Sequence, residues 1–228
     1  MKFLFIDETE KFGQFGVSAV LIDHSKYPII KKSIWNELSK YKWSFNEEFK
    51  STQIFSSSTG DINVTVAQRM ELAKRIMKTN IGEKNNRLKA YFCYSKAKRS
   101  QDLYCKLLEK IIKKLPKATN SKNGKNLIAI FVDELDGGHS YRERACKSIN
   151  KLSERDYLLV DYPSFVKSSN HTTGILLADH IAFVANWKIL SKQDKDREVS
   201  EIKKKKNEFI SELHDQIGEI NKFKVEKC

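Results

Sequence analysis

Two stretches of the sequence share one pattern, in which a run of hydrophobic residues ends in two acids. Residues 2–8 read KFLFIDE, and residues 126–134 read NLIAIFVDE. Runs of this length that are rich in Ile, Val and Phe are typical of central strands that are covered on both faces. We therefore expect two buried strands, whose C-terminal ends present acid pairs that begin at Asp7 and at Asp133.

Elsewhere, hydrophobic residues recur with the spacing of a strand or of a helix, and the two kinds of segment alternate. Residues 15–22 follow the first strand after a short turn that contains Gly13, so we expect an antiparallel hairpin. The alternation beyond it is typical of an α/β protein with a mixed sheet. Further strands are expected at 88–95 and 157–160, and helices at 31–40, 65–79, 101–115, 141–152, 173–190 and 194–222.

Acids at the ends of neighbouring strands repel one another and raise each other's pKa, and a bound divalent cation relieves this repulsion. The hypothesis is a metal site across the strand ends, with Asp7 and Asp133 as ligands. The alternative is that each acid only ends a strand and begins a turn. After Asp133, the segment 136–138 (Asp-Gly-Gly) already supplies turn residues, which makes the alternative less necessary there.

A third acid lies inside a hydrophobic helix. The segment 175–187 reads ILLADHIAFVANW, so Asp179 is expected to be buried or nearly buried. An unpaired buried carboxylate is costly, and Asp179 should therefore have a partner. The partner is either an Arg or Lys in a structural ion pair or a metal ion. His180 points about a quarter of a turn away and is interpreted as an ordinary helix residue.

The charge balance points to a polyanionic partner. The 228 residues include 42 Lys and Arg against 29 Asp and Glu, which gives a formal charge of +13. Nucleic acid is the first candidate for such a protein, although a lysine-rich composition alone is an open alternative. The four cysteines form no CxxC pair, so a zinc knuckle is not expected.

Several other classes find no support in the sequence. It contains no GxxxxGK[ST], GxGxxG or GxSxG motif, which leaves phosphate-loop hydrolases and serine hydrolases unsupported. No hydrophobic stretch approaches the length of a membrane span, and no signal peptide pattern is present. We therefore expect a cytoplasmic protein that has no membrane partner.

Four short motifs occur in order along the chain: FIDE, EEFKS, FVDE and TGILLADHIAF. Together they resemble the domain of unknown function 3800 family of bacterial and phage proteins, which is similar to the ribonuclease-H-like superfamily of nucleases and integrases. The resemblance covers residues 1–190, for which it implies a ribonuclease-H-like mixed sheet flanked by helices. Residues 191–228 are then a C-terminal extension with a charged helix.

The resemblance also implies site residues. It favours Glu48 over Glu47, which the residues alone do not distinguish. One departure lies in the late motif, where Leu177 stands at the position at which the family often has a Gln. The implied set consists of the acid pair Asp7 and Glu8, the Glu-x-Lys element Glu48 and Lys50, the strand-end acid Asp133, and Asp179.

The function expected from these observations is a divalent-metal-dependent nuclease that hydrolyses phosphodiester bonds of DNA or RNA. Two Mg²⁺ or Mn²⁺ ions are expected, because carboxylate oxygens are the ligands that these ions prefer. Asp7 bridges the ions, Glu48 and Asp133 complete one site, and Asp179 completes the other. Outside this ligand set, Glu8 points off the site and Lys50 orients Glu48 or contacts the scissile phosphate.

Two further expectations concern binding. The basic residues Arg142, Arg144, Lys147 and Lys151 are expected to contact the nucleic-acid backbone without reading sequence. The alternative function is a catalytically inactive module that binds nucleic acid or protein. In that case the hydrophobic stripe of the helix at 194–222 pairs with another chain, for instance in a homodimer.

Overall fold

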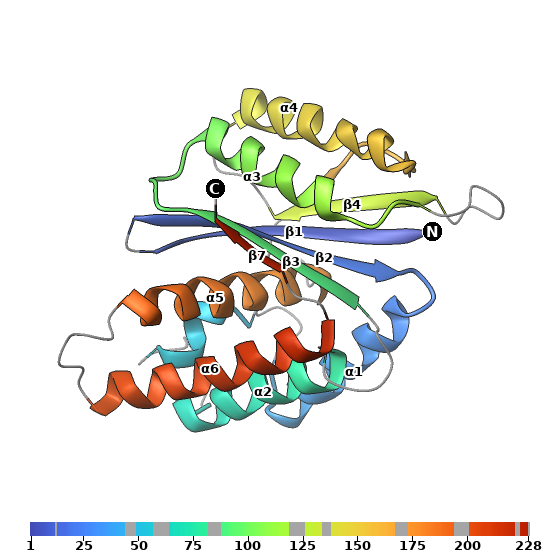
Figure 1. Cartoon of the computed structure of the whole chain (residues 1–228). Coiled ribbons are helices and arrows are strands. Elements are labelled where there is room, and N and C mark those ends of the chain that lie inside the picture. The colour runs from blue at the N-terminus through green and yellow to red at the C-terminus, as the bar shows by residue number, and fades with distance from the viewer. Residues whose placement is uncertain are drawn as a thin grey trace.

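The computed structural model describes residues 1–11, 13–43, 49–56, 64–81, 88–118, 126–133, 138–166, 173–193, 201–221 and 224–227. Within these ranges the chain is an α/β protein, in which one mixed sheet separates two layers of helices (Figure 1). The architecture is consistent with a ribonuclease-H-like α/β fold, so the fold class expected from the sequence is confirmed. None of the described helices is both long and hydrophobic enough to span a membrane.

The described strands form a seven-stranded sheet in the order β5-β4-β1-β2-β3-β7, and β6 also pairs with β4. Strand β1 is antiparallel to β2 and parallel to β4, so β1 lies at the centre of a mixed sheet. The strands are β1 (Lys2–Lys11), β2 (Gln14–Asp23), β3 (Leu88–Ser95), β4 (Leu127–Asp133), β5 (Leu158–Leu159), β6 (Ser164–Val166) and β7 (Lys224–Lys227).

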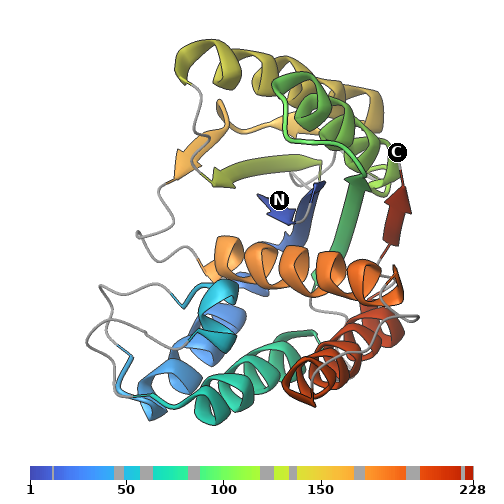
Figure 2. The ribbon, with the colours of Figure 1, turned by 90° about the vertical axis from the view of Figure 1, so that its left-hand side faces the viewer.

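The helices cover the two faces of the sheet unequally (Figures 1 and 2). Helices α3 (Gln101–Lys114) and α4 (Gly138–Ile149) form one layer. On the other face α5 (Thr173–Gln193) lies directly against the strands. Outside α5 lie α1 (Tyr27–Lys40), α2 (Val66–Ile81) and α6 (Glu201–Asn221). The described residues also include two short 3-10 helices, η1 (Ser51–Phe55) and η3 (Asn150–Arg155).

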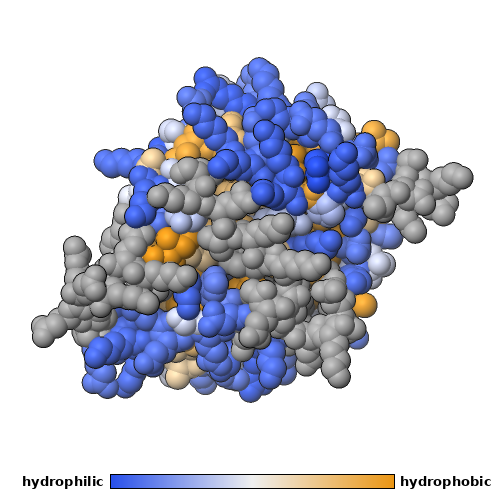
Figure 3. Space-filling model, viewed as in Figure 1, coloured by the Kyte–Doolittle hydropathy of each residue, from blue (hydrophilic) through white to orange (hydrophobic). Residues whose placement is uncertain are grey.

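The side chains of β1 alternate between the two faces of the sheet and so belong to two different hydrophobic cores. Leu4 and Ile6 pack with residues of α3 and α4, whereas Phe5 packs with residues of α5. Successive side chains of a strand point to opposite faces. Asp7 therefore projects to the α5 side of the sheet, and Glu8 projects to the α3 and α4 side. In the view of Figure 3 the outer helices are covered mostly by hydrophilic residues.

Helix α5 carries hydrophobic residues on almost all sides, and the sheet and the outer helices cover it. A helix of this kind belongs in a protein interior. Its first turn approaches β1 closely, since a Cβ atom at Gly174 would lie 2.2 Å from Cγ of Phe5. One turn later, the Ser18 hydroxyl of β2 donates a hydrogen bond of 2.7 Å to the carbonyl oxygen of Ala178. Glycine and the serine hydroxyl together fix the height of α5 above the sheet.

A Gly174→Ala variant is therefore expected to be less stable than the wild-type chain. The Phe5 ring cannot move aside, because it stacks on Tyr27 and Phe131 at centroid distances of 5.2 and 5.0 Å. Overpacking of this kind costs about 1–3 kcal/mol, which urea unfolding measures. Alanine is the better helix former by about 1 kcal/mol, so a variant that gains stability would contradict the close approach.

Several element boundaries differ from those expected. Strand β1 continues to Lys11, because its polar end pairs with the start of β2 in the hairpin. Helix α1 begins at Tyr27, with a proline in its first turn, where the missing N–H costs nothing. The short strands β6 and β7 were not expected; β7 pairs in parallel with β3.

The C-terminal helix packs on its own chain. Its hydrophobic residues share one core with α5, so the stripe that was expected to pair with another chain in the alternative function is occupied. The boundary expected at residue 190 falls within α5. The stripe residues buried in this way are Phe209, Ile210, Leu213 and Ile217.

Candidate functional site

Asp7 and Asp133 occupy corresponding positions on two neighbouring parallel strands. The last paired residues of the register are Ile6 and Val132, and each acid follows directly. Both Ile6 and Val132 point into the core beneath α3 and α4, so both acids project to the α5 side. Neighbouring strands lie about 5 Å apart, which brings the two carboxylates close together where β4 ends. Because β1 continues to Lys11, Asp7 lies within its strand and not at the strand end that the sequence had led us to expect.

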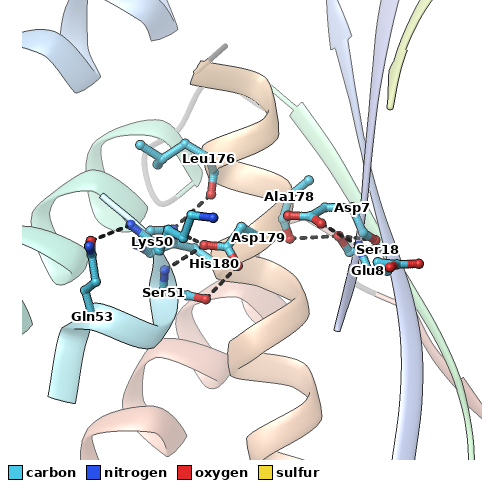
Figure 4. A network of polar contacts seen from close by, with 10 residues as sticks. All are labelled: Asp7, Glu8, Ser18, Lys50, Ser51, Gln53, Leu176, Ala178, Asp179 and His180. Carbon is cyan, nitrogen blue, oxygen red and sulfur yellow. Dashed lines mark hydrogen bonds and ion pairs between the residues drawn. The ribbon is translucent and has the colours of Figure 1, made fainter. Parts of the chain in front are cut away.

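Asp179 approaches the same place from the second turn of α5. It follows Ala178, whose carbonyl oxygen accepts the hydrogen bond from Ser18, and Ser18 lies opposite Asp7 in the hairpin register. Figure 4 shows Asp179 between the loop that carries Lys50 and the strand that carries Asp7. The hydrogen bond from Ser18 thus holds two of the expected site residues at a fixed separation.

Both carboxylate oxygens of Asp179 accept hydrogen bonds from Ser51, the first residue of η1. The Ser51 amide donates to Oδ2 at 2.6 Å, and the Ser51 hydroxyl donates to Oδ1 at 2.7 Å. The sequence predicted either a cationic partner or a metal ion for Asp179, and it did not predict this serine. Ser51 is the last residue of the EEFKS motif, which was the available signal. Asp179 remains 21% exposed, so its oxygens are not sealed in the core.

The pKa of Asp7 is strongly perturbed. Its side chain is only 6% exposed. Burial raises its pKa well above the usual range, and the nearby charges of Asp179 and Asp133 raise it further. The Glu8 amide, which donates to Oδ1 at 2.6 Å, acts in the opposite direction. The three acids are therefore electrostatic neighbours, and the negative charge of Asp7 is costly unless a cation shares the site.

Glu8 points to the opposite face of the sheet. There it forms an ion pair with Arg99 and lies near the hydroxyl groups of Tyr104 and Tyr141. Burial raises the pKa of both tyrosines, and the Glu8 charge raises it further. Glu8 therefore acts on the pKa of Asp7 in two ways: its backbone amide lowers that pKa, and its charge raises it by a smaller amount.

The remaining expected residues have different outcomes. Glu48 and its neighbour Glu47 lie outside the described residues. Lys50 is exposed, and its backbone amide donates to Gln53 Oε1 at 2.9 Å, which fixes the start of η1. His180 is 1% exposed and bonds the Leu176 carbonyl through Nδ1 at 2.9 Å, as suits a helix residue in a core.

The basic residues of α4 and η3 are largely neutralised by nearby acids. Arg144 pairs with Asp102, Lys147 with Glu143 and Lys151 with Glu109, at 2.7, 3.0 and 2.6 Å. Exposed pairs of this kind are weak. Arg142 lies over the Phe165 ring at 5.5 Å. All four residues belong to the helical layer opposite α5, whereas Asp7 and Asp133 project to the α5 side of the sheet and Asp179 lies on α5.

The carboxylates fit the preferences of a hard divalent cation in charge and in ligand type. Carboxylate oxygens are the usual ligands of Mg²⁺ and Mn²⁺, and the raised pKa of Asp7 is the expected signature of acids arranged around a cation. In the ranges that the structure describes, no three His, Cys, Asp or Glu side chains stand close enough to hold one ion together. The fourth expected ligand, Glu48, lies outside those ranges.

Fold and site together define an α/β protein with acidic residues on two neighbouring parallel strands, at the level where β4 ends, and on the helix that covers them. Ligand sites of α/β sheets gather at this edge. Comparison with protein-family models gives no match to the chain. Comparison with curated proteins gives no match either.

Proposed function

We propose that this chain is a divalent-metal-dependent nuclease that hydrolyses phosphodiester bonds in DNA or RNA. The observation that carries the proposal is the burial of Asp7 beside Asp133 and Asp179, with a strongly raised pKa. A buried group with a perturbed pKa in a cluster of like charges is typical of a functional site. The ordered motifs that resemble the domain of unknown function 3800 family support the same interpretation.

Asp7, Asp133, Asp179 and Glu48 would hold the two Mg²⁺ or Mn²⁺ ions. Ions in such a site activate a water molecule and stabilise the charge that develops on the leaving oxygen. Lys50, at the exposed start of η1, is suited to contact the scissile phosphate or to orient Glu48.

Other residues of the chain keep the acids in position. Ser51 holds both oxygens of Asp179, so the carboxylate has one orientation. Ser18 holds the α5 backbone next to Asp179 against the sheet. Ligand groups that are oriented by such outer hydrogen bonds bind metal more tightly, typically by about 10–100-fold. Leu177 is fully buried in the hydrophobic core, so its departure from the family pattern leaves the acids intact.

A cleavage assay tests the proposal. Labelled single-stranded and double-stranded DNA, RNA and an RNA–DNA hybrid are incubated with the protein in Mg²⁺, in Mn²⁺ and in EDTA. We expect metal-dependent cleavage that the Asp7→Asn variant loses and that an Asp161→Asn variant keeps, since Asp161 is exposed. If no substrate is cut, and calorimetry finds that the wild type and Asp7→Asn take up Mn²⁺ equally, the chain is instead a binding module.

A further inference from the structure

A second group of residues lies beside the acids, toward the ends of the same structural elements. It consists of two lysines and three aromatic side chains, which we call the basic-aromatic cluster. The Lys11 ammonium lies 3.5 Å from the centroid of Trp187 and 5.5 Å from that of Phe183. The Lys206 ammonium lies 5.2 Å from the centroid of Phe55. The members are Lys11, Phe55, Phe183, Trp187 and Lys206.

The aromatic rings make the cluster one unit. The Phe55 ring contacts Trp187 and Phe183 at centroid distances of 5.8 and 6.2 Å. The Trp187 indole N–H donates to Asn207 at 2.7 Å, which ties α5 to α6 next to Lys206. Lys11 and Lys206 are both half-buried.

The cluster and the acids form one row along the α5 face. On β1, Asp7 and Lys11 point to the same face and are about 13 Å apart along the strand, from the rise per residue. On α5, Asp179 and Trp187 are eight residues apart, or about 12 Å along the helix axis. The hydrogen bond from Ser18, which lies opposite Asp7, to Ala178 and the contact of Lys11 with Trp187 show that strand and helix run side by side over this length.

Electrostatics favour an anion at the cluster. The pKa of Lys11 is lowered to about 8, first by burial and then by the charge of Lys206. Both causes disfavour the ammonium form. An oxyanion beside the two lysines would reverse both effects, because an opposite charge favours the charged form of each. The α5 face thus carries the acids, which suit a cation, and the basic-aromatic cluster, which suits an anion.

We propose that Lys11 and Lys206 bind a backbone phosphate of the nucleic-acid strand, so that the strand lies along β1 and α5 with its reacting phosphate at the acids. This inference rests on the proposed function for the nature of the ligand. Contacts to phosphate position a strand and read no sequence. The alternative is that the lysines only cover an aromatic surface through cation–π contacts, which alone stabilise by about 0.5–1 kcal/mol.

Binding of labelled single-stranded DNA and RNA by fluorescence anisotropy tests the inference. All variants are made in the Asp7→Asn background with Mg²⁺ present, so that binding is read without cleavage. Lys11→Gln and Lys206→Gln are each expected to weaken binding about fivefold at 0.1 M salt and to lower the salt slope by about 0.7. Lys106→Gln removes the same charge from an exposed site on α3 and should change neither quantity.

Two further measurements separate phosphate binding from packing. Lys11→Arg keeps the charge over the Trp187 ring and is expected to retain binding, with thermal unfolding as the check on folding. At pH 8, an amine-reactive reagent should label Lys11 more slowly when the oligonucleotide is present, whereas the labelling of Lys106 should not change. Mass spectrometry of peptides reads both rates.

The outcomes distinguish this inference from the proposed function. If the oligonucleotide protects Lys11 from labelling but the protein cuts no substrate, the phosphate site is supported and the nuclease proposal is contradicted. The opposite result is also possible: the wild type cleaves a substrate, but Lys11 is not protected and the glutamine variants bind like Lys106→Gln. That result would contradict the phosphate site and leave the nuclease proposal intact. Failure of every oligonucleotide to bind would overturn the phosphate site as well.

Discussion

The Asp7→Asn variant is expected to be more stable than the wild-type chain at neutral pH when no divalent cation is present. Asp7 is buried, and the charges of Asp179 and Asp133 act on it. Asparagine has nearly the same shape, and its oxygen can still accept the hydrogen bond from the Glu8 amide. The substitution therefore removes an unfavourable buried charge and little else. Urea unfolding in EDTA measures the gain, with Asp161→Asn as the control that should show none.

The stability gap between Asp7→Asn and the wild type should depend on pH. The pKa of Asp7 is raised in the folded state above its unfolded value of about 3.9, so the folded chain binds this proton more tightly. The wild type therefore loses stability as the pH rises from about 3.9 through the raised pKa. A difference of one in pKa between the folded and unfolded states corresponds to about 1.4 kcal/mol. Below about pH 3.9 both states are protonated and the gap should close.

Divalent cations should reverse the order of stability. An ion that binds only the folded state stabilises it, by about 2.7 kcal/mol at one hundred times its dissociation constant. Mg²⁺ or Mn²⁺ is thus expected to raise the melting temperature of the wild type and of Asp161→Asn, but not that of Asp7→Asn. A wild type that is more stable than Asp7→Asn in EDTA would show that the Asp7 carboxylate has a structural role instead.

The fold follows from local patterns to a large extent. The sequence predicted strands β1 and β4 from their hydrophobic runs and helix α3 from the spacing of its hydrophobic residues. Each of these patterns is contained within the element itself. Strands β6 and β7 are only three and four residues long and exist because they pair with β4 and β3. A strand that depends on a distant partner leaves only a weak trace in its own sequence.

The site divides in the same way. The hydrophobic runs predicted that both acids end a strand, which is right for Asp133 but wrong for Asp7, because the polar residues after Asp7 pair with β2. Parallel pairing of β1 with β4 puts the two acids in corresponding positions. The contact between Asp179 and Ser51 joins residues 128 positions apart, and no spacing rule reaches that far. Burial required a partner for Asp179, but burial does not say whether the partner is a cation or a pair of hydrogen-bond donors.

The stripe of α6 shows a limit of the same kind. Hydrophobic residues at helical spacing predict that a helix buries one face, but they do not identify the surface that covers it. Here that surface is α2 and α5 of the same chain. Two basic residues, Arg144 of α4 and Lys151 of η3, are a parallel case, because their acidic partners Asp102 and Glu109 lie on α3.

Replacements of Asp179 are expected to separate its two roles. In Asp179→Asn, the amide oxygen can accept from the Ser51 amide, and the amide nitrogen can donate to the Ser51 hydroxyl, which also accepts. The anchor of η1 is then kept while the charge is lost. We therefore expect Asp179→Asn to be nearly as stable as the wild type. Its loss of metal-dependent cleavage should exceed the roughly 10–100-fold loss that is typical when a residue that only hydrogen-bonds to a metal ligand is replaced.

Asp179→Ala should lose both roles. The two donors of Ser51 would lose their acceptor, and hydrogen bonds to a charged group contribute about 1.5–3 kcal/mol each to stability. Urea unfolding should therefore show a marked loss for Asp179→Ala and little loss for Asp179→Asn, while both are inactive in the cleavage assay. An Asp179→Asn variant that cuts as fast as the wild type would identify the carboxylate as an anchor for η1 alone, and a metal site would then have to be built without it.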